Sequence, residues 1–465
     1  MSAVRQWVGG FIIIAGTVSM APRVMAQQEG TTPDSVPLAA RVDDLEQQIR
    51  VLKRLRELEG DSIAAAAKDK ATVTANGKDG FSIKSADGKY VLKLRGYAQA
   101  DGRFYGGDEA KAVPNTFFLR RARPIVEATV GKYFGFRIMP DFGGGQTVLT
   151  DAYGDINLTP SFAFRLGKFK PPVGLERLQS ATDIVFAERG LPTNLVPNRD
   201  IGLQLGGDIH TGVLTYAVGI FNGVVDQGNG DGDLNDSKDL DARVFLQPFT
   251  QGSLKGLGFG LAATTGTEQG GLAGTTLNSG LPSYRSPGQQ TVFRYRVDAA
   301  APLNSVIADG RRSRLVPQGY FYSGPFGLQG EYAISRQEVR LGPSTAELTH
   351  KAWQASGSFF LTGEKAGFRS PTPKKVFDPK EHGYGALELV ARYGELDVDD
   401  DAFPIFASPT SSISKEKSAG VGLNWHLNKQ IKVAVNYEHT TFDGGAADGD
   451  RKSEDFFVTR FQHSF

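Results

Sequence analysis

The chain has 465 residues, with 52 Lys and Arg against 51 Asp and Glu, so no basic excess indicates a nucleic-acid partner. It contains no cysteine, which excludes a disulfide framework, a thiolate nucleophile and a cysteine-ligated metal. The length fits either several domains or a single large β-barrel.

Residues 1–26 have the pattern of a secretory signal peptide. Arg5 supplies a basic start, an apolar run extends from Trp7 to Met20, and Val24-Met25-Ala26 fits a cleavage site. The alternative, a membrane anchor, is disfavoured because the run is too short to cross ~30 Å of hydrocarbon. We therefore expect an exported chain that starts near Gln27 after cleavage.

Residues 27–75 are predicted to form a periplasmic linker and a short coiled-coil helix. Apolar residues at alternating spacings of four and three form the seam: Leu38, Val42, Leu45, Ile49 and Leu52. A helix of about two heptads is marginal alone, so the seam over 38–58 implies a partner chain or surface. The alternative is an amphipathic helix that folds back on its own domain.

Residues 76–465 are dominated by alternating apolar and polar positions, which predict β-strands. In "YVLKLRGYAQADGRFY" (90–105), Leu92, Leu94, Ala98 and Phe104 alternate with charged and polar residues. The stretch is longer than the roughly five or six residues of a typical soluble strand. A long strand with one apolar and one charged face suits a wall between lipid and water.

Seventeen candidate strands can be counted, and the short candidate at 290–296 lies in an irregular stretch. Single-chain bacterial barrels have even strand numbers, so we assign 290–296 to a loop and predict an all-β, sixteen-stranded antiparallel transmembrane barrel. Short turns alternate with long loops, as a barrel requires. The long loops are expected near 105–116, 171–200, 223–239, 266–313, 398–414 and 444–451, and a long connection at 363–383 interrupts the short-turn rim.

Several motifs in this order resemble the phosphate-selective porins (porin O and P type) of Gram-negative outer membranes. They include "LRGYAQADGRF", "FFLRRARPIVE", "LGKFKPPVGLERLQSATD", "VPNRDIGLQLGGDI", "SGPFGLQGEY" and "VGLNWHLNKQIKVAVNYEHT". The resemblance covers roughly residues 80–465. It implies a sixteen-stranded barrel in the outer membrane, a homotrimer, third and fifth loops folded inward, and a basic channel for phosphate or other small anions.

An anion channel needs cations that face water along the path, because low-dielectric walls focus their field. Alternation and the third long loop supply the candidate anion pathway, which comprises Lys93, Arg95, Arg103, Arg121, Arg123, Arg137, Arg165, Lys168, Lys170, Arg177 and Arg189. Arginine suits phosphate because its planar fork can donate two hydrogen bonds to one oxyanion. The alternative is that each cation pairs with a nearby carboxylate and only braces the loop to the wall.

Other functions fit the sequence less well. A general diffusion porin is the main alternative, and a sugar porin would present lumen aromatics where this lumen face is charged. Six scattered histidines lie in no nucleophile motif, so we expect no enzyme, and no cofactor or metal is predicted. The acidic loop 226–239 departs from the EF-hand calcium pattern at its Gly and Glu positions, which favours a solvated loop.

Overall fold

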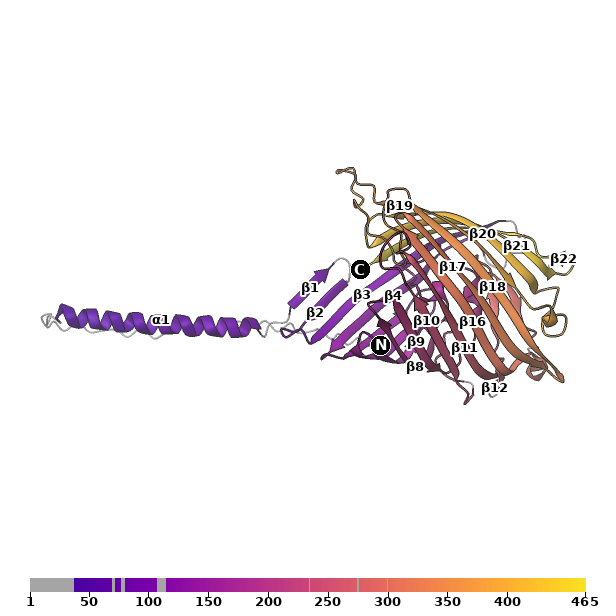
Figure 1. Ribbon diagram of the computed structural model, residues 1–465, viewed down its shortest axis with the longest axis horizontal. Coiled ribbons are helices and arrows are strands. Elements are labelled where there is room, and N and C mark those ends of the chain that lie inside the picture. The colour runs from indigo at the N-terminus through magenta and orange to yellow at the C-terminus, as the bar shows by residue number, and fades with distance from the viewer. Residues whose placement is uncertain are drawn as a thin grey trace, which may run out of the picture. The chain divides into compact units, whose positions relative to one another are not determined.

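The computed structural model describes residues 37–68, 72–76, 80–106, 114–233, 235–273, 276–298 and 300–465. The chain divides into an N-terminal helical unit and a β-barrel unit (Figure 1). The signal peptide and cleavage site predicted for residues 1–26 lie outside the described residues.

The described part of the N-terminal unit forms one helix, α1 (Leu38–Lys68), which confirms the predicted helix and extends it beyond residue 58. The seam residues Leu45 and Leu52 are exposed in the single chain. The helix alone leaves the predicted coiled coil a proposal. No helix among the described residues is long and apolar enough to cross a membrane.

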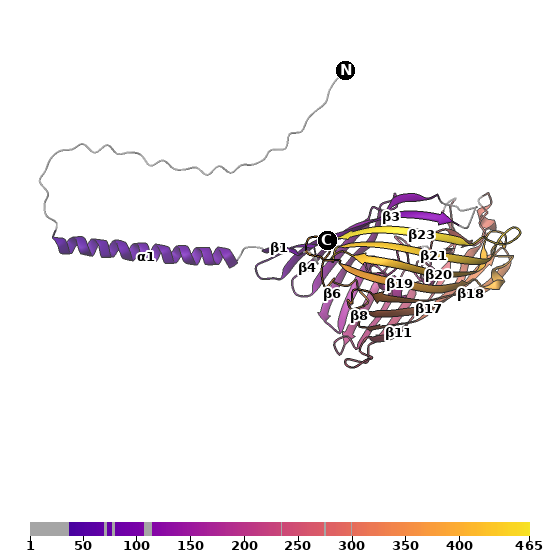
Figure 2. The same cartoon turned by 90° about the horizontal axis from the view of Figure 1, so that it is seen from above.

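Sixteen strands of the described chain form a closed antiparallel barrel, as the alternation predicted (Figure 2). They are β3 (Tyr90–Gly106), β4 (Thr116–Val130), β5 (Phe134–Asp141), β6 (Val148–Thr159), β7 (Phe162–Phe169), β8 (Asp200–Ile209), β9 (Leu214–Phe221), β10 (Asp239–Leu246), β11 (Leu257–Gln269), β16 (Ile307–Ser323), β17 (Phe326–Leu341), β18 (Ser344–Phe360), β19 (Ala386–Asp397), β20 (Ile413–His426), β21 (Ile431–Ala446) and β23 (Glu454–Ser464). Each strand pairs with the next, and β23 closes the barrel on β3.

The wall separates an apolar outer face from a polar inner face. In β17, Phe326 and Leu328 are 60% and 54% exposed, whereas Gln329 and Glu331, which follow at odd-numbered positions, are 5% and 6% exposed. Successive residues of a strand point to opposite faces, so this alternation follows directly from the sequence.

Smaller elements lie in the loops and before the barrel. They are β1 (Thr72–Asn76), β2 (Gly80–Lys84), α2 (Leu175–Leu178), η1 (Leu191–Leu195), β12 (Gly271–Ala273), β13 (Thr276–Asn278), β14 (Ser283–Arg285), β15 (Thr291–Arg294), η2 (Pro302–Asn304), η3 (Asp400–Ala402) and β22 (Gly449–Asp450). The segment assigned to a loop at 290–296 contains β15, which pairs only with β14 in a separate two-stranded sheet and is not a strand of the barrel wall, so the assignment is confirmed. The expected domain boundary between residues 75 and 76 falls inside β1.

The hydrophobic core lies inside the barrel, where two long loops fold inward. We call residues 170–199 loop L3 and residues 270–306 loop L5. Leu191 and Leu195 of L3 pack with Tyr284 and Phe293 of L5, against inward-facing residues of β16–β18 such as Leu348. The inward position of the third and fifth loops, which the resemblance implied, is therefore observed.

A β-bulge in β4 changes which residues face the lumen. Gln99 pairs with Arg121 but Ala100 pairs with Leu119, so Arg120 is an extra residue in β4. Strict alternation back from Val126 and Ala122 would place Phe118 on the outer face, but alternation stops at the bulge. Phe117 and Leu119 face outward instead, and Phe118 lies under the guanidinium of the lumen residue Arg103 at 4.5 Å.

Candidate functional site

A large cavity, here called the vestibule, extends from the short-turn rim of the barrel to L3 and measures about 1260 Å³. Thr159, Pro160 and Asn428 line it at the rim, and Lys170 and Gln179 line it at L3. It is open to solvent and carries charged residues on its strand walls, so it can hold hydrated ions.

Four of the predicted pathway cations line the vestibule wall, and each is paired with a carboxylate. The pairs are Arg95–Glu127 (2.7 Å), Arg123–Asp141 (2.7 Å), Arg137–Glu127 (2.9 Å) and Arg165–Asp155 (2.8 Å). A paired cation has its field largely cancelled by its partner at distances beyond the pair. These four arginines therefore follow the alternative in which each cation pairs with a nearby carboxylate.

The structure separates other predicted cations from the vestibule. Lys93 is exposed near the start of β3 and is absent from the vestibule lining. Lys168 is buried in β7 and forms an ion pair with Asp231, so it belongs to the wall and not to the third loop.

L3 carries three predicted cations whose contacts differ from those of the wall. Lys170 donates to the carbonyl of Gln179 (2.7 Å), and Arg177 donates to that of Thr193 (2.7 Å). Arg189 donates to the carbonyls of Glu176 (3.1 Å) and Gln179 (2.8 Å). Within the described part of the chain, none of the three cations forms an ion pair with a carboxylate within 4.0 Å. Their positive charges are therefore left uncompensated at short range.

A second cavity, here called the loop pocket, lies between L3, L5 and β4 and measures about 240 Å³. Its lining contains five arginines and one carboxylate, together with hydroxyl and amide side chains of L3 and its neighbours. The arginines are Arg120, Arg121, Arg177, Arg189 and Arg285, and the carboxylate is Glu188. Such a lining presents hydrogen-bond donors and a net positive charge to any small group inside.

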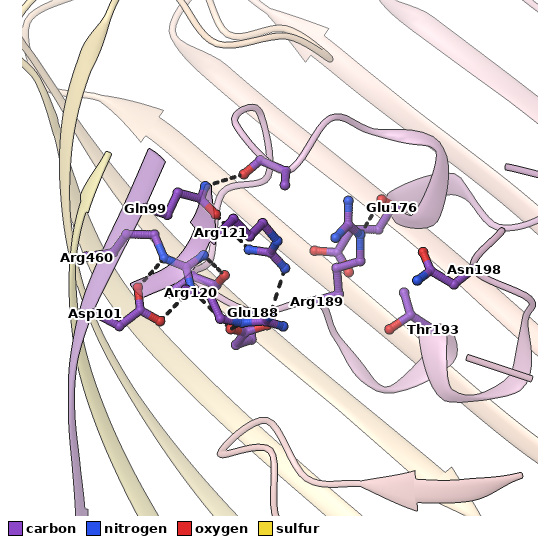
Figure 3. A network of polar contacts seen from close by, with 12 residues as sticks. Gln99, Asp101, Arg120, Arg121, Glu176, Glu188, Arg189, Thr193, Asn198 and Arg460 are labelled. Carbon is purple, nitrogen blue, oxygen red and sulfur yellow. Dashed lines mark hydrogen bonds and ion pairs between the residues drawn. The ribbon is translucent and has the colours of Figure 1, made fainter. Parts of the chain in front are cut away.

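Glu188 joins L3 to the barrel wall. Its carboxylate accepts from Arg120 (2.6 Å) and Arg460 (3.1 Å) and also pairs with Arg103, as Figure 3 shows in part. Burial by itself raises the pKa of the Glu188 carboxyl, but the guanidinium groups of Arg120, Arg103 and Arg460 hold it well below its usual range. Glu188 therefore stays ionised and, together with Asp101, offsets part of the charge of those three arginines.

Arg103 and Arg121, two further pathway candidates, lie where Glu188 joins L3 to the barrel wall. Arg103 is buried against Glu188 and Asp101. Arg121 donates to Gln99 at 2.7 Å and lies 3.8 Å from Glu188, so it is held mainly by a neutral amide (Figure 3). Of the two, Arg121 alone lines the loop pocket.

The far side of L3 is held by the opposite wall and by L5. The backbone N–H of Leu175 donates to Glu331 of β17 at 2.6 Å. The Asn194 side chain donates to the carbonyl of Arg285 (2.9 Å) and accepts from its N–H (3.1 Å). These contacts fix L3 across the lumen, so its cations have defined positions.

Lys170 lines one cavity and is affected by the charge of a cation that lines the other. It lines the vestibule, whereas Arg177 and Arg189 line the loop pocket. Burial, together with the nearby charges of Arg189 and Arg199, holds the pKa of Lys170 well below its usual value of 10.5. The cations on the two sides of L3 are therefore close enough to interact.

Sequence reasoning missed several residues of the loop pocket. Strict alternation places Arg120 on the outer face, opposite to its sequence neighbour Arg121. The bulge turns Arg120 inward, where it donates to Glu188. Asn194 and Asn198 enter from L3, where alternation gives no signal. The motif "FFLRRARP" contains adjacent arginines, and that doublet was the one local hint of an irregular strand.

The acidic loop 226–239 uses its carboxylates within the protein. Asp231 pairs with Lys168, and Asp233 pairs with Lys238 at 2.6 Å. The described residues contain no group of three or more His, Asp or Glu arranged to hold a metal ion.

The sequence matches the family described as "Phosphate-selective porin O and P" over residues 92–465. It is 24% identical to porin O of Pseudomonas aeruginosa over 444 residues, covering 85% of this chain and 93% of that protein.

The fold is similar to that of two solved barrels. The outer membrane channel DcaP of Acinetobacter baumannii aligns over 82% of this chain and 99% of its own, with a TM-score of 0.52 and 13% identity. The anion-selective porin from Comamonas acidovorans aligns over 81% of this chain and 100% of its own, with a TM-score of 0.50 and 11% identity. At these identities the two structures support the fold alone.

Proposed function

Because the chain belongs to the phosphate-selective porin O and P family, we propose that it forms an anion-selective channel for phosphate or related oxyanions. The protein is a porin of a Gram-negative outer membrane. The observation that supports this function best is the set of three L3 cations, Lys170, Arg177 and Arg189, whose contacts are carbonyl and amide oxygens.

The L3 cations can attract an anion because their charge is not cancelled by an adjacent carboxylate. The backbone carbonyls that they contact orient the side chains and carry no net charge. In a lumen of lowered dielectric, such charges act more strongly than they do in bulk water. An anion in the vestibule meets Lys170, and one in the loop pocket meets Arg177, Arg189 and Arg121.

The composition of the loop pocket favours an oxyanion over chloride. Guanidinium groups donate paired hydrogen bonds to the oxygens of a phosphate, and Thr193 with the amides of Asn198 and Gln289 offers further polar contacts. Chloride gains the attraction to the positive charge but not the paired geometry. We expect chloride to permeate and phosphate to bind.

A general diffusion porin is the second candidate, and the paired vestibule wall favours it. Four wall arginines are paired with carboxylates at 2.7 to 2.9 Å, so these four contribute little net field to the wide part of the lumen. The two candidates differ in whether L3 controls permeation. If ions pass L3 at a distance greater than the Debye length of about 8 Å at physiological salt, the pore will not select.

We further propose how the remaining segments serve the channel. Residues 1–26 act as a cleaved signal peptide, and α1 with its linker lies in the periplasm. The apolar seam of α1 joins copies of the chain in a coiled coil, which supports a homotrimer of barrels. The exposed Leu45 and Leu52 are the supporting observation, since a single chain leaves that seam in water.

Planar-bilayer recording tests the channel. A purified protein in a KCl gradient should give a reversal potential that favours chloride, and added phosphate should reduce the chloride current at concentrations where sulfate reduces it less. A reversal potential that favours potassium would contradict the anion channel. Chloride selectivity without phosphate block would leave an anion channel that does not bind phosphate.

A further inference from the structure

The hairpin formed by β1 and β2 extends the barrel wall next to its closing seam. Along β3, pairing with β23 stops at Ser464↔Tyr97, and pairing with β2 begins at Phe81↔Leu94. β1 then pairs with β2, which adds two strands to the sheet beside the chain end Phe465, whose backbone bonds to Gly96. Figure 1 shows β1 and β2 side by side with the start of β3.

The outer apolar face of the barrel continues across this hairpin. Residues in register share a face of the sheet, and two such rows run from the hairpin into the wall. They are Val73–Ile83–Leu92–Ala128–Phe136 and Phe81–Leu94–Val126–Ile138. The rows face outward, because the intervening Arg95 points into the vestibule.

These apolar side chains are open in the single chain. Val73 is 72% exposed, Phe81 53% and Ile83 48%. A contiguous apolar patch on a protein surface is unfavourable in water and marks an interaction site. Water alone is therefore a poor environment for this face.

Lipid is also a poor environment for the hairpin, because β1 is an open edge. The described residues place no strand on the far side of β1, so alternate N–H and C=O groups of Thr72–Asn76 have no sheet partner. Open sheet edges do not occur in the hydrocarbon of a bilayer, where each unpaired group costs several kcal/mol. Because neither water nor lipid suits the outer face of the hairpin, we expect another protein surface to pack against it.

The position of α1 in the chain points to a second copy as that protein. α1 ends at Lys68 and β1 begins at Thr72, so four residue steps, at most about 14 Å, join the helix to the hairpin. If the α1 seam joins copies as proposed above, each hairpin is held within that reach of the shared helical bundle. The neighbouring surface available to the hairpin is then the same region of another copy.

We propose that the outer face of the β1–β2 hairpin, with the adjoining part of β3, is a subunit interface that packs against a second copy of this chain. Val73, Phe81 and Ile83 bury their side chains in the contact, and the open edge of β1 lies at its margin. The interface uses the association of α1 but is independent of what the channel conducts.

The absence of cysteine in this chain allows a direct test by single-cysteine cross-linking in the native outer membrane. Val73→Cys, Phe81→Cys and Ile83→Cys should each give cross-linked oligomers with a short bis-maleimide. Ser82→Cys, on the opposite face of β2, and Leu328→Cys, on the outer face of distant β17, serve as controls and should stay monomeric on denaturing gels.

Cross-linking at the three hairpin positions well above both controls supports the interface. Equal cross-linking at Leu328→Cys, or none at the hairpin, overturns it. Quenching of a fluorophore on Ile83→Cys by brominated lipid would also overturn it, because lipid would then cover the face. None of these readouts depends on selectivity, so a failed interface and a failed anion channel remain distinguishable.

Discussion

The vestibule wall and L3 carry the same types of cation but place them against different partners. On the wall, Arg123 and Arg165 pair with carboxylates at 2.7 and 2.8 Å. On L3, Arg177 and Arg189 donate to backbone carbonyls at 2.7 and 2.8 Å. Both arrangements satisfy the guanidinium, but only the second leaves a net charge. The number of arginines in a lumen therefore says less about selectivity than the identity of their acceptors.

The largest effect is expected from reversing two of the L3 charges. Lys170→Glu with Arg177→Glu should abolish or reverse anion preference, changing the chloride-to-potassium permeability ratio about tenfold or more. A unit charge at about 4 Å is worth roughly 1–4 kcal/mol between bulk water and an effective dielectric of 20, and a tenfold ratio needs about 1.4 kcal/mol. Reversal potentials in a KCl gradient measure the ratio.

The control for this pair is Lys255→Glu with Lys375→Glu, which makes the same charge change at exposed residues that line neither cavity. Equal changes in the two double variants would mean that L3 has no special role.

A smaller effect is expected from pH, through Lys170. Burial and the charges of Arg189 and Arg199 lower its pKa, so its positive charge is present at low pH and is lost at a lower pH than the usual 10.5. As the pH rises, anion selectivity in KCl should therefore fall in a step centred below pH 10.5. The fall should be about fivefold for a charge worth about 1 kcal/mol. Lys170→Arg should remove the step, since arginine stays protonated. An identical step in that variant would assign it to another group.

Neutralising either residue of one ion pair in the vestibule wall should change anion selectivity weakly. The two substitutions should change it in opposite directions. Asp155→Asn leaves Arg165 unpaired and should raise the permeability ratio, whereas Arg165→Gln leaves Asp155 and should lower it. Partly exposed pairs are worth about 0–1 kcal/mol, so each change should be about twofold. Effects as large as those of the L3 double variant would show that the wall also selects.

No change in selectivity is expected from removing the N-terminal unit. A chain that lacks residues 27–68 keeps β1, β2 and the complete barrel, so it should insert and conduct with an unchanged reversal potential. Its oligomers should dissociate more readily in detergent, as native gels can measure. Failure of this chain to fold would place the helix within the folding unit of the barrel.

The alternation along the chain was enough to predict the wall. A period of two is a local property, and it placed Gln99, Asp101 and Arg103 on the inner face of β3, where they are buried. The same rule failed at Phe118 and Arg120, because the bulge depends on the pairing of β4 with β3. A register shift of this kind has no cause within the strand's own pattern.

The barrel, its strand number and the cations of the third loop could be predicted from the sequence, because side-chain alternation and loop length are local properties. Which cations retain a net charge depends on contacts that form only in the folded chain. Glu188 lies beside Arg189 in sequence but pairs with Arg103 and Arg460 from β3 and β23, whereas Arg189 finds only carbonyls. Pairing between groups distant in the chain depends on how L3 crosses the lumen, and periodicity carries no information about that crossing.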